Sequence, residues 1–318
     1  MNSSVIIPAF NAEKTIEKTI GSVLEQSLKP KEIIVVNDGS TDKTEKIVKR
    51  IAEKNLSVKL FNRNNSGISA SRNFGALNAS AEIIVFLDSD VSVEKKWLEK
   101  LVLPLKDKNV FACCGKYSVE SNKSFSSDFF SFVVSSSSFQ GYNIAFRKKD
   151  FLEFNGFNEN MRFSEDPELF LRAVISGKKL VETNAESFHT SYSLSERIKS
   201  NYNYSFFDAV LFKKNFGFLA NPLNLFKAPK NIKYIFGFYF MVFFSAILTI
   251  LLFLASGNIF SVLFVFLPCL AGCIKIALNK NNALYCNNFV LVMFYSFFAL
   301  FLFELVKGTG FVKGLLFG

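Results

Sequence analysis

The chain has 318 residues, a formal net charge of +10 at pH 7 and 50% hydrophobic residues, with 40 Phe among its aromatic residues. The positive charge does not indicate a nucleic-acid partner, because no stripe of Arg and Lys interleaved with aromatic residues precedes the apolar C-terminal part. The five Cys match neither a disulfide framework nor a zinc pattern, which argues against a disulfide-stabilised secreted protein and against a zinc domain.

Three short runs of β-branched and apolar residues, 4–10, 32–37 and 81–87, predict buried parallel strands. Apolar residues at helical spacing predict helices over 14–26 and 41–54, one after each of the first two strands. This alternation is typical of a doubly wound α/β domain, whose ligands bind beyond the carboxyl ends of the strands. Functional residues are therefore expected in the loops that follow the three strands.

Polar residues stand at all three of these positions. Asn11 follows the first strand, residues 38–42 follow the second, and Asp88-Ser89-Asp90 follows the third. Two carboxylates one residue apart suit Mg²⁺ or Mn²⁺ under a pyrophosphate, because these cations take oxygen ligands and use only one or two protein carboxylates. A solvated turn is the alternative for the acidic motif alone, but the three clusters together favour a nucleotide site.

The segment 65–73 joins a Gly turn to the start of a helix and places Arg72 one turn into that helix. The guanidinium could pair with a phosphate, or it could pair with Asp88 and hold that carboxylate in place. The alternative is that this segment is an ordinary surface helix start.

Two adjacent acids, Glu165 and Asp166, precede Pro167 and an amphipathic helix. Pro at the first helical position with Asp just before it is ordinary capping chemistry, so Asp166 could simply cap the helix. The adjacent pair indicates more, because a positioned carboxylate could take the proton from an attacking hydroxyl group. His189, the only His in the chain, follows a strand-like run over 179–188 and is interpreted, taken alone, as structural.

Three long apolar runs, 234–255, 259–278 and 289–306, each approach the ~20 residues that cross a bilayer. They predict a transmembrane region over 231–318, after a domain over 1–230. Residues 191–230 of that domain are expected close to the membrane.

The expected orientation depends on charge. No secretory signal precedes the first strand, so the first domain is expected on the cytoplasmic face of an integral membrane protein. Three spans would place Lys307 and Lys313 outside, which the positive-inside rule disfavours, so the number of spans stays open between two and four. A basic band before the first run supports the cytoplasmic side: Lys213, Lys214, Lys227, Lys230 and Lys233.

These motifs resemble, in the same order, those of the family 2 glycosyltransferases with the GT-A fold. The resemblance covers about 3–190, and six segments carry it: 5–11, 35–42, 65–73, 87–90, 141–147 and 165–166. It implies an α/β GT-A domain with a Rossmann-like mixed sheet, here followed by C-terminal transmembrane helices. It also implies inverting transfer of a sugar from a nucleotide-sugar donor with the help of Mg²⁺ or Mn²⁺.

The resemblance further implies a donor site, a metal site, a catalytic pair and an acceptor-facing segment. The residues concerned are Pro8, Ala9, Asn11, Asp38, Arg72 and Asp88 for the donor; Asp88, Asp90 and His189 for the metal; Asp166 as the base with Glu165 beside it; and Asn143 and Arg147 for the acceptor.

Two departures from relatives in this family narrow the expected acceptor. Processive polysaccharide synthases carry Gln-x-x-Arg-Trp after the acidic pair, whereas the only Trp here, Trp97, precedes it. Polyprenyl-phosphate mannose or glucose synthases typically lack a comparable acidic pair, because their phosphate acceptor is already ionised. A hydroxyl of a membrane-associated, lipid-linked saccharide is therefore the expected acceptor, and a polyprenyl-phosphate sugar synthase is the alternative.

Two other classes of protein fit the sequence less well. A nucleotidyltransferase should carry a Gly-rich first loop with basic residues for a triphosphate, but here the first strand ends in Pro8-Ala9-Phe10-Asn11. A non-catalytic membrane scaffold would tolerate the loss of Asp90 and Asp166, and both are present.

Overall fold

The computed structural model describes residues 2–119, 141–161, 163–189, 210–211 and 213–215. All of these except 210–215 belong to one compact unit. The predicted spans over 234–255, 259–278 and 289–306 lie outside the described residues. Within the described part, no helix has both the length and the apolar character needed to cross a membrane.

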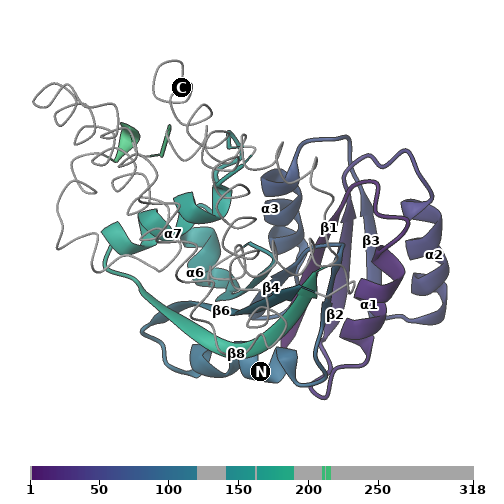
Figure 1. The fold of residues 1–318 in the computed structure, drawn as a ribbon, viewed down its shortest axis with the longest axis horizontal. Helices are drawn as coiled ribbons and strands as arrows, with labels where there is room; N and C mark the ends of the chain where they lie inside the picture. Colours follow the sequence, from purple (N-terminus) through teal and green to yellow (C-terminus); the bar gives the residue numbers. More distant parts are fainter. Residues whose placement is uncertain (1, 120–140, 162, 190–209, 212, 216–318) are drawn as a thin grey trace, which may run out of the picture. The chain divides into compact units, whose positions relative to one another are not determined.

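Eight strands of this unit form one mixed sheet in the order β3-β2-β1-β4-β7-β6-β8-β5 (Figure 1). The first four are parallel, whereas β7 runs antiparallel to both β4 and β6. The three predicted strands are confirmed as β1, β2 and β4, and the strand-like run over 179–188 is present as β8, whereas β3, β5, β6 and β7 were not predicted. The strands are β1 Ser3–Ala9, β2 Glu32–Asn37, β3 Val58–Asn62, β4 Ile83–Leu87, β5 Val91–Val93, β6 Val110–Val119, β7 Asn143–Arg147 and β8 Lys179–His189.

The two helices predicted over 14–26 and 41–54 are present as α1 and α2, but each begins later than predicted. The helix start expected within 65–73 and the amphipathic helix expected after Pro167 are present as α3 and α7. The predicted start of α2 at residue 41 is wrong because the backbone amides of Thr41 and Lys43 donate to the side chains of Asn11 and Glu13 and hold a loop. The helices are α1 Ile16–Leu24, α2 Thr44–Lys54, α3 Ile68–Asn78, α4 Trp97–Val102, α6 Lys148–Glu153 and α7 Glu165–Ile175, with a 3₁₀ turn, η1, over Leu103–Lys106.

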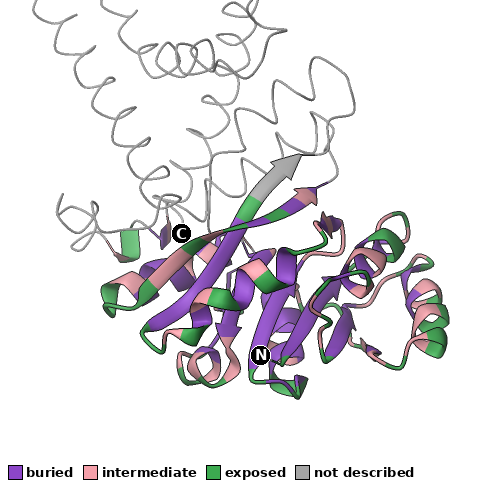
Figure 2. Cartoon of the chain, turned by 90° about the horizontal axis from the view of Figure 1, so that it is seen from below, coloured by how far each residue is buried: buried purple, intermediate pink, exposed green. Residues whose placement is uncertain are grey.

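Helices cover both faces of the central strands, which are buried at every position (Figure 2). Alternate side chains of a strand point to opposite faces, so Val5 and Ile7 join the core with Ile16 of α1, while Ile6 faces α3. A Cβ added to Gly75 of α3 would lie 2.4 Å from Ile6 Cγ2, so this helix approaches the sheet closely only because residue 75 is Gly. Strands covered on both faces account for the continuous apolar runs in the sequence.

The link between β4 and β5 shows that the sheet is strongly bent. Only residues 88–90 join the two strands, and such a link reaches at most about 14 Å from Leu87 to Val91. Three strands stand between β4 and β5, which in a flat sheet would separate them by about 19 Å. The long strand β8 therefore curves back toward β4 (Figure 1), helped by two irregularities in its pairing with β6.

Candidate active site

The loops after β1 and β2 are tied to each other at the carboxyl edge of the parallel strands. The side chain of Asn11, which has a left-handed backbone with φ of 51°, accepts from the Thr41 amide at 2.8 Å. The backbone amide of Asn11 in turn donates to Ser40 Oγ at 3.0 Å. Pro8 and Ala9 end β1 and are buried, whereas Asn11 is exposed. The bonded residues thus give this edge a fixed, polar surface.

Asp38 joins a third loop to this surface. Its two carboxylate oxygens accept from the backbone amides of Ser66 and Gly67, at 2.9 and 2.8 Å. Gly67 has a φ of 93°, a left-handed conformation that other residues adopt only with strain, so the turn before α3 requires Gly there. Asp38 therefore lies where the sequence predicted it, at the carboxyl end of β2 and beside the start of α3.

The bend of the sheet brings Asp90 to His189. Val91 pairs with His189 across β5 and β8, so Asp90, one residue earlier, reaches the end of β8. Asp90 Oδ2 lies 3.2 Å from His189 Nε2, and the buried imidazole packs edge-on against Tyr142, with ring centroids 5.9 Å apart.

This pair suits a divalent cation. A carboxylate oxygen and an imidazole nitrogen are both metal-binding groups, and Mn²⁺ accepts the two kinds. Among the residues that the structure describes, there is no group of three or more His, Cys, Asp or Glu side chains that could hold a metal ion. Of the three predicted metal ligands, Asp90 and His189 lie next to each other, whereas Asp88 pairs with Arg72.

Arg72 is buried and holds two carboxylates. Its Nη2 lies 2.7 Å from Asp88 Oδ1, and its Nη1 lies 2.7 Å from Glu165 Oε1. Burial by itself lowers the pKa of Arg72, but the charges of Asp88 and then Glu165 outweigh it, so the net pKa is raised and the guanidinium stays charged. Of the two roles that the sequence left open for Arg72, the pairing with Asp88 is the one present.

Asp166 lies in the first turn of α7 and contacts a distant segment. The helix begins at Glu165, so Asp166 is not its capping residue, and Asp166 Oδ2 accepts from the Gly141 amide at 2.9 Å. Burial, followed by the charge of Glu165, raises the pKa of Asp166 well above that of an ordinary aspartate, although Arg72 and the Gly141 amide oppose the shift. A carboxyl group with a raised pKa binds a proton more readily, as a general base requires.

Gly141 is the residue whose importance the sequence did not reveal. A Cβ at this position would lie 2.7 Å from Arg72 Nη1, so only Gly lets the chain pass over the guanidinium and still donate its amide to Asp166. Gly141 is the first residue of the segment 141–147, so the sequence did contain a signal for it. Its contacts with Arg72 and Asp166, however, join residues that lie far apart in the sequence.

The structure places Arg147, which was predicted to face the acceptor, at the end of β7 away from Asp88. In the antiparallel pair of β4 and β7, Asn143 lies opposite Leu87 while Arg147 lies opposite Ile83. Arg147 is thus about 14 Å along the strand from the edge that carries Asp88. There its guanidinium pairs with Asp150 at 2.6 Å and donates to backbone carbonyls that include that of Leu105. Arg147 fastens the loop before β6 instead of contacting a ligand.

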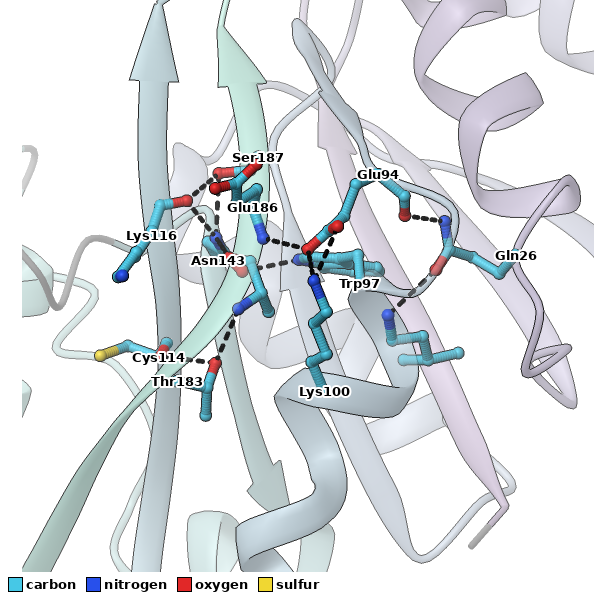
Figure 3. A network of polar contacts seen from close by, with 12 residues as sticks. Gln26, Glu94, Trp97, Lys100, Cys114, Lys116, Asn143, Thr183, Glu186 and Ser187 are labelled. Carbon is cyan, nitrogen blue, oxygen red and sulfur yellow. Dashed lines mark hydrogen bonds and ion pairs between the residues drawn. The ribbon is translucent and has the colours of Figure 1, made fainter.

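Asn143, the other residue predicted to face the acceptor, lies at the edge that carries Asp88, but its side chain points into the protein (Figure 3). The buried amide accepts from Trp97 Nε1 at 2.7 Å and donates to Ser187 Oγ at 2.9 Å, as well as to the carbonyls of Lys116 and Ala185. Asn143 therefore joins β7 to α4, β6 and β8, and its amide group is occupied by these internal contacts.

Comparison with known proteins matches residues 4–164 to the family described as Glycosyl transferase family 2. A cholesterol galactosyltransferase of Borreliella burgdorferi is 39% identical over 114 residues, which are 36% of this chain and 32% of that protein. The glycosyltransferase GlyA of Streptococcus pneumoniae is 35% identical over 114 residues, 36% of this chain and 16% of that protein. The chain thus spans about a third or less of the length of these two relatives.

Two solved structures show the same fold at low sequence identity. The mannosyltransferase PcManGT from Pyrobaculum calidifontis, in complex with GDP-Man and Mn²⁺, superposes with a TM-score of 0.65 and 18% identity, covering 99% of this chain and 87% of that one. GalNAc-T7 with UDP, GalNAc and Mn²⁺ gives a TM-score of 0.53 and 18% identity, covering 67% of this chain and 48% of that one. With its order of motifs, its mixed α/β sheet and a match over half of its length, the chain belongs to glycosyl transferase family 2.

Proposed function

We propose that this protein transfers a sugar from a nucleoside-diphosphate sugar to a hydroxyl group of a membrane-associated, lipid-linked saccharide. One observation carries the proposal: Arg72 pairs with both Asp88 and Glu165, so the loop after β4 and the start of α7 meet at one place. Ligands of such sheets bind at the carboxyl ends of the strands, where both motifs lie. The relatives in complex with GDP-Man and Mn²⁺, or with UDP and Mn²⁺, have the same fold and support the donor class.

In the proposed reaction Asp166 is the general base. It takes the proton of the acceptor hydroxyl while the oxygen attacks the anomeric carbon of the donor. The bond from that carbon to the diphosphate breaks on the opposite side, the nucleoside diphosphate leaves, and the configuration is inverted. The raised pKa of Asp166 supports this role, because a stronger base accepts a proton at a lower cost in free energy.

The geometry of the carboxyl edge supports the proposed donor and metal roles. Pro8, Ala9, Asn11 and Asp38 are proposed to form the nucleoside pocket, since hydrogen bonds between their loops hold this edge together. A divalent cation bound by Asp90 and His189 would neutralise charge on the diphosphate, and both Mg²⁺ and Mn²⁺ suit a site of one or two protein ligands.

The membrane part of the proposal rests on the sequence. The apolar runs over 234–255, 259–278 and 289–306 are proposed to anchor the chain and present a lipid-bound acceptor, with the first 230 residues on the cytoplasmic face. The acidic pair favours a hydroxyl acceptor over the polyprenyl phosphate of the alternative reaction, because an ionised phosphate needs no base.

The proposal is tested by incubating membranes that contain the full chain with a panel of radiolabelled nucleotide sugars and Mn²⁺, then identifying the labelled lipid. We expect one donor to label a glycolipid with a new sugar–hydroxyl linkage, and EDTA to abolish the labelling. Label on a polyprenyl phosphate would favour the alternative acceptor. No labelled lipid from any donor would contradict the proposed activity.

A further inference from the structure

Arg72 is the contact between two parts of the site that lie far apart in the sequence. Its side chain is 2% exposed, and its two terminal nitrogens each lie 2.7 Å from a carboxylate oxygen, one on Asp88 and one on Glu165. The guanidinium carbon lies 5.3 Å from the centre of the Phe157 ring, and Gly141 passes directly over its end. With both terminal nitrogens paired and its side chain buried, Arg72 lacks the exposure needed to bind a phosphate directly.

The two acids of the pair have different partners. Glu165 Oε1 is bound to the positive charge of Arg72, and its side chain is 8% exposed. Asp166 Oδ2 accepts from the neutral Gly141 amide. The ion pair with Arg72 therefore holds Glu165 in place, whereas Asp166, whose pKa is raised by burial and by the charge of Glu165, is bonded to a neutral backbone group. The asymmetry between the two acids follows from the position of Arg72.

We infer that Arg72 is a positioning residue with two tasks. It fixes the donor loop after β4 to the catalytic helix α7 through Asp88 and Glu165, and by engaging Glu165 it leaves Asp166 as the carboxylate that accepts the proton. This inference rests on the proposed glycosyl transfer. It assigns Glu165 the part of a counter-ion for Arg72, although Glu165 stands next to the base in the sequence.

The chemistry of arginine explains why this residue type is needed. A guanidinium is a planar fork that donates in two directions at once, whereas a lysine ammonium is a single point charge on a flexible stem. The two carboxylates occupy different nitrogens of the fork. Lysine at this position would keep the charge but could not hold both carboxylates in the same geometry, so α7 and the donor loop would no longer be fixed to each other.

Four variants of the full chain test the inference: Glu165→Gln, Asp166→Asn, Arg72→Lys and, as the matched control, Arg50→Lys. Arg50 pairs with Glu17 on the exposed surface of α1 and α2, so its exchange reports the general cost of Arg→Lys. For each variant, kcat, KM for the donor and melting temperature are measured on one preparation. The variant Arg72→Lys/Glu165→Gln completes a double-mutant cycle.

We expect Glu165→Gln to lower kcat by about tenfold or less, because its amide oxygen can still accept from Arg72. Asp166→Asn should lower kcat by about 10² to 10⁴ with an unchanged donor KM, the range of a lost general base. Arg72→Lys should lower kcat by about 10² and also raise the donor KM, since lysine cannot hold both carboxylates in place and small misplacements have costs of this size. Its effect should be smaller in the Glu165→Gln background.

Two results would overturn the role of Arg72. One is an Arg72→Lys variant that behaves like Arg50→Lys in kcat and KM, and the other is a Glu165→Gln variant as impaired as Asp166→Asn. If Arg72→Lys fails to fold, the comparison of Glu165→Gln with Asp166→Asn still decides which acid is the base. A parent chain that transfers no sugar overturns the proposed function itself, so the two failures are distinguishable.

Discussion

Two clusters of carboxylates lie at opposite ends of the strands, and their charges are balanced in different ways. At the amino ends of the strands, Glu32 begins β2 as a single carboxylate surrounded by donors. Its Oε1 accepts from Ser4 Oγ at 2.6 Å and from the amide and hydroxyl of Ser80 at 2.6 and 2.8 Å, while Oε2 pairs with Lys59 at 2.6 Å. At the carboxyl ends, three carboxylates, those of Asp88, Glu165 and Asp166, surround a single guanidinium.

The difference shows in the proton affinity of the two clusters. Burial raises the pKa of Glu32, but the hydrogen bonds from Lys59, Ser4 and Ser80 outweigh it and lower the pKa to about 2. The pKa of Asp166 is raised by burial and by the charge of Glu165. An excess of donors therefore gives a permanently ionised, stabilising group, whereas an excess of carboxylates leaves one that can take up a proton. The first arrangement suits structure and the second suits catalysis.

The largest loss of activity is expected when Asp166, the carboxylate that can take up a proton, is replaced. Asp166→Asn keeps the size of the side chain and its bond to Gly141, but it removes the ability to accept a proton. Turnover should fall by about 10² to 10⁴ while donor affinity and melting temperature change little. Rates measured with saturating donor, together with thermal unfolding, check this. A variant that keeps transfer within about threefold of the parent would show that Asp166 is not the base.

A loss of metal-dependent donor binding is expected when Asp90 is replaced. Asp90 lies beside His189 and does not belong to the Arg72 cluster. Asp90→Ala removes a proposed metal ligand from a loop and not a core side chain, so the fold should remain intact. The part of donor affinity that depends on Mn²⁺ should disappear. Calorimetry with UDP or GDP, with and without Mn²⁺, measures this part directly, and an unchanged Mn²⁺-dependent affinity would contradict the metal assignment.

The Glu32 cluster should make the free energy of unfolding depend on pH in the acid range. The pKa of Glu32 is about 2 in the folded protein against an ordinary value of 4.5, so its stabilising contribution is complete above about pH 4.5 and is lost as the pH falls toward 2. The loss is at most about 3 kcal/mol. Glu32→Gln should be less stable than the parent at neutral pH, and the difference should shrink in acid. Denaturant unfolding between pH 2 and 7 measures it, with a constant difference as the contrary result.

The smallest effect is a change in stability, and it is expected when Gly141, beside Arg72, is replaced. Gly141→Ala places a methyl group 2.7 Å from Arg72 Nη1, so it should destabilise the protein by about 1–3 kcal/mol, the usual cost of overpacking. The control is Gly21→Ala in α1, where no atom lies within 4 Å of the added group and the better helix former should add up to about 1 kcal/mol. Thermal unfolding of both variants should give shifts of opposite sign.

The sequence predicted the parallel half of the fold well, because its elements depend on local patterns. Runs of β-branched residues marked β1, β2 and β4, and helical spacing marked α1 and α2. In the second half the sequence indicated only β8, as a strand-like run over 179–188, and the pairings of β5 to β8 join distant segments, of which β6 with β8 is an example. Such pairings are set by tertiary packing, and no spacing within one segment announces them.

The site followed the same division. Asn11, Asp38 and the Asp88–Asp90 motif were placed correctly because they end strands whose order is readable from the sequence. Arg147 and Asn143 were misplaced, because a motif gives residue types but neither the register of a strand nor the face that a side chain takes. The double contact of Arg72 was equally out of reach, since one of its two partners lies 93 residues away.

The short link over 88–90 also bears on how this part of the chain can change in length. If one residue were deleted from the link and β5 moved to keep the link closed, the register of β5 with β8 would shift by one position. Such a shift turns every side chain of a strand to the other face of the sheet, so Asp90 would turn away from His189 although both residues remained. Substitutions at Ser89 leave the spacing intact, whereas insertions and deletions there do not, so this loop is expected to vary in composition but not in length.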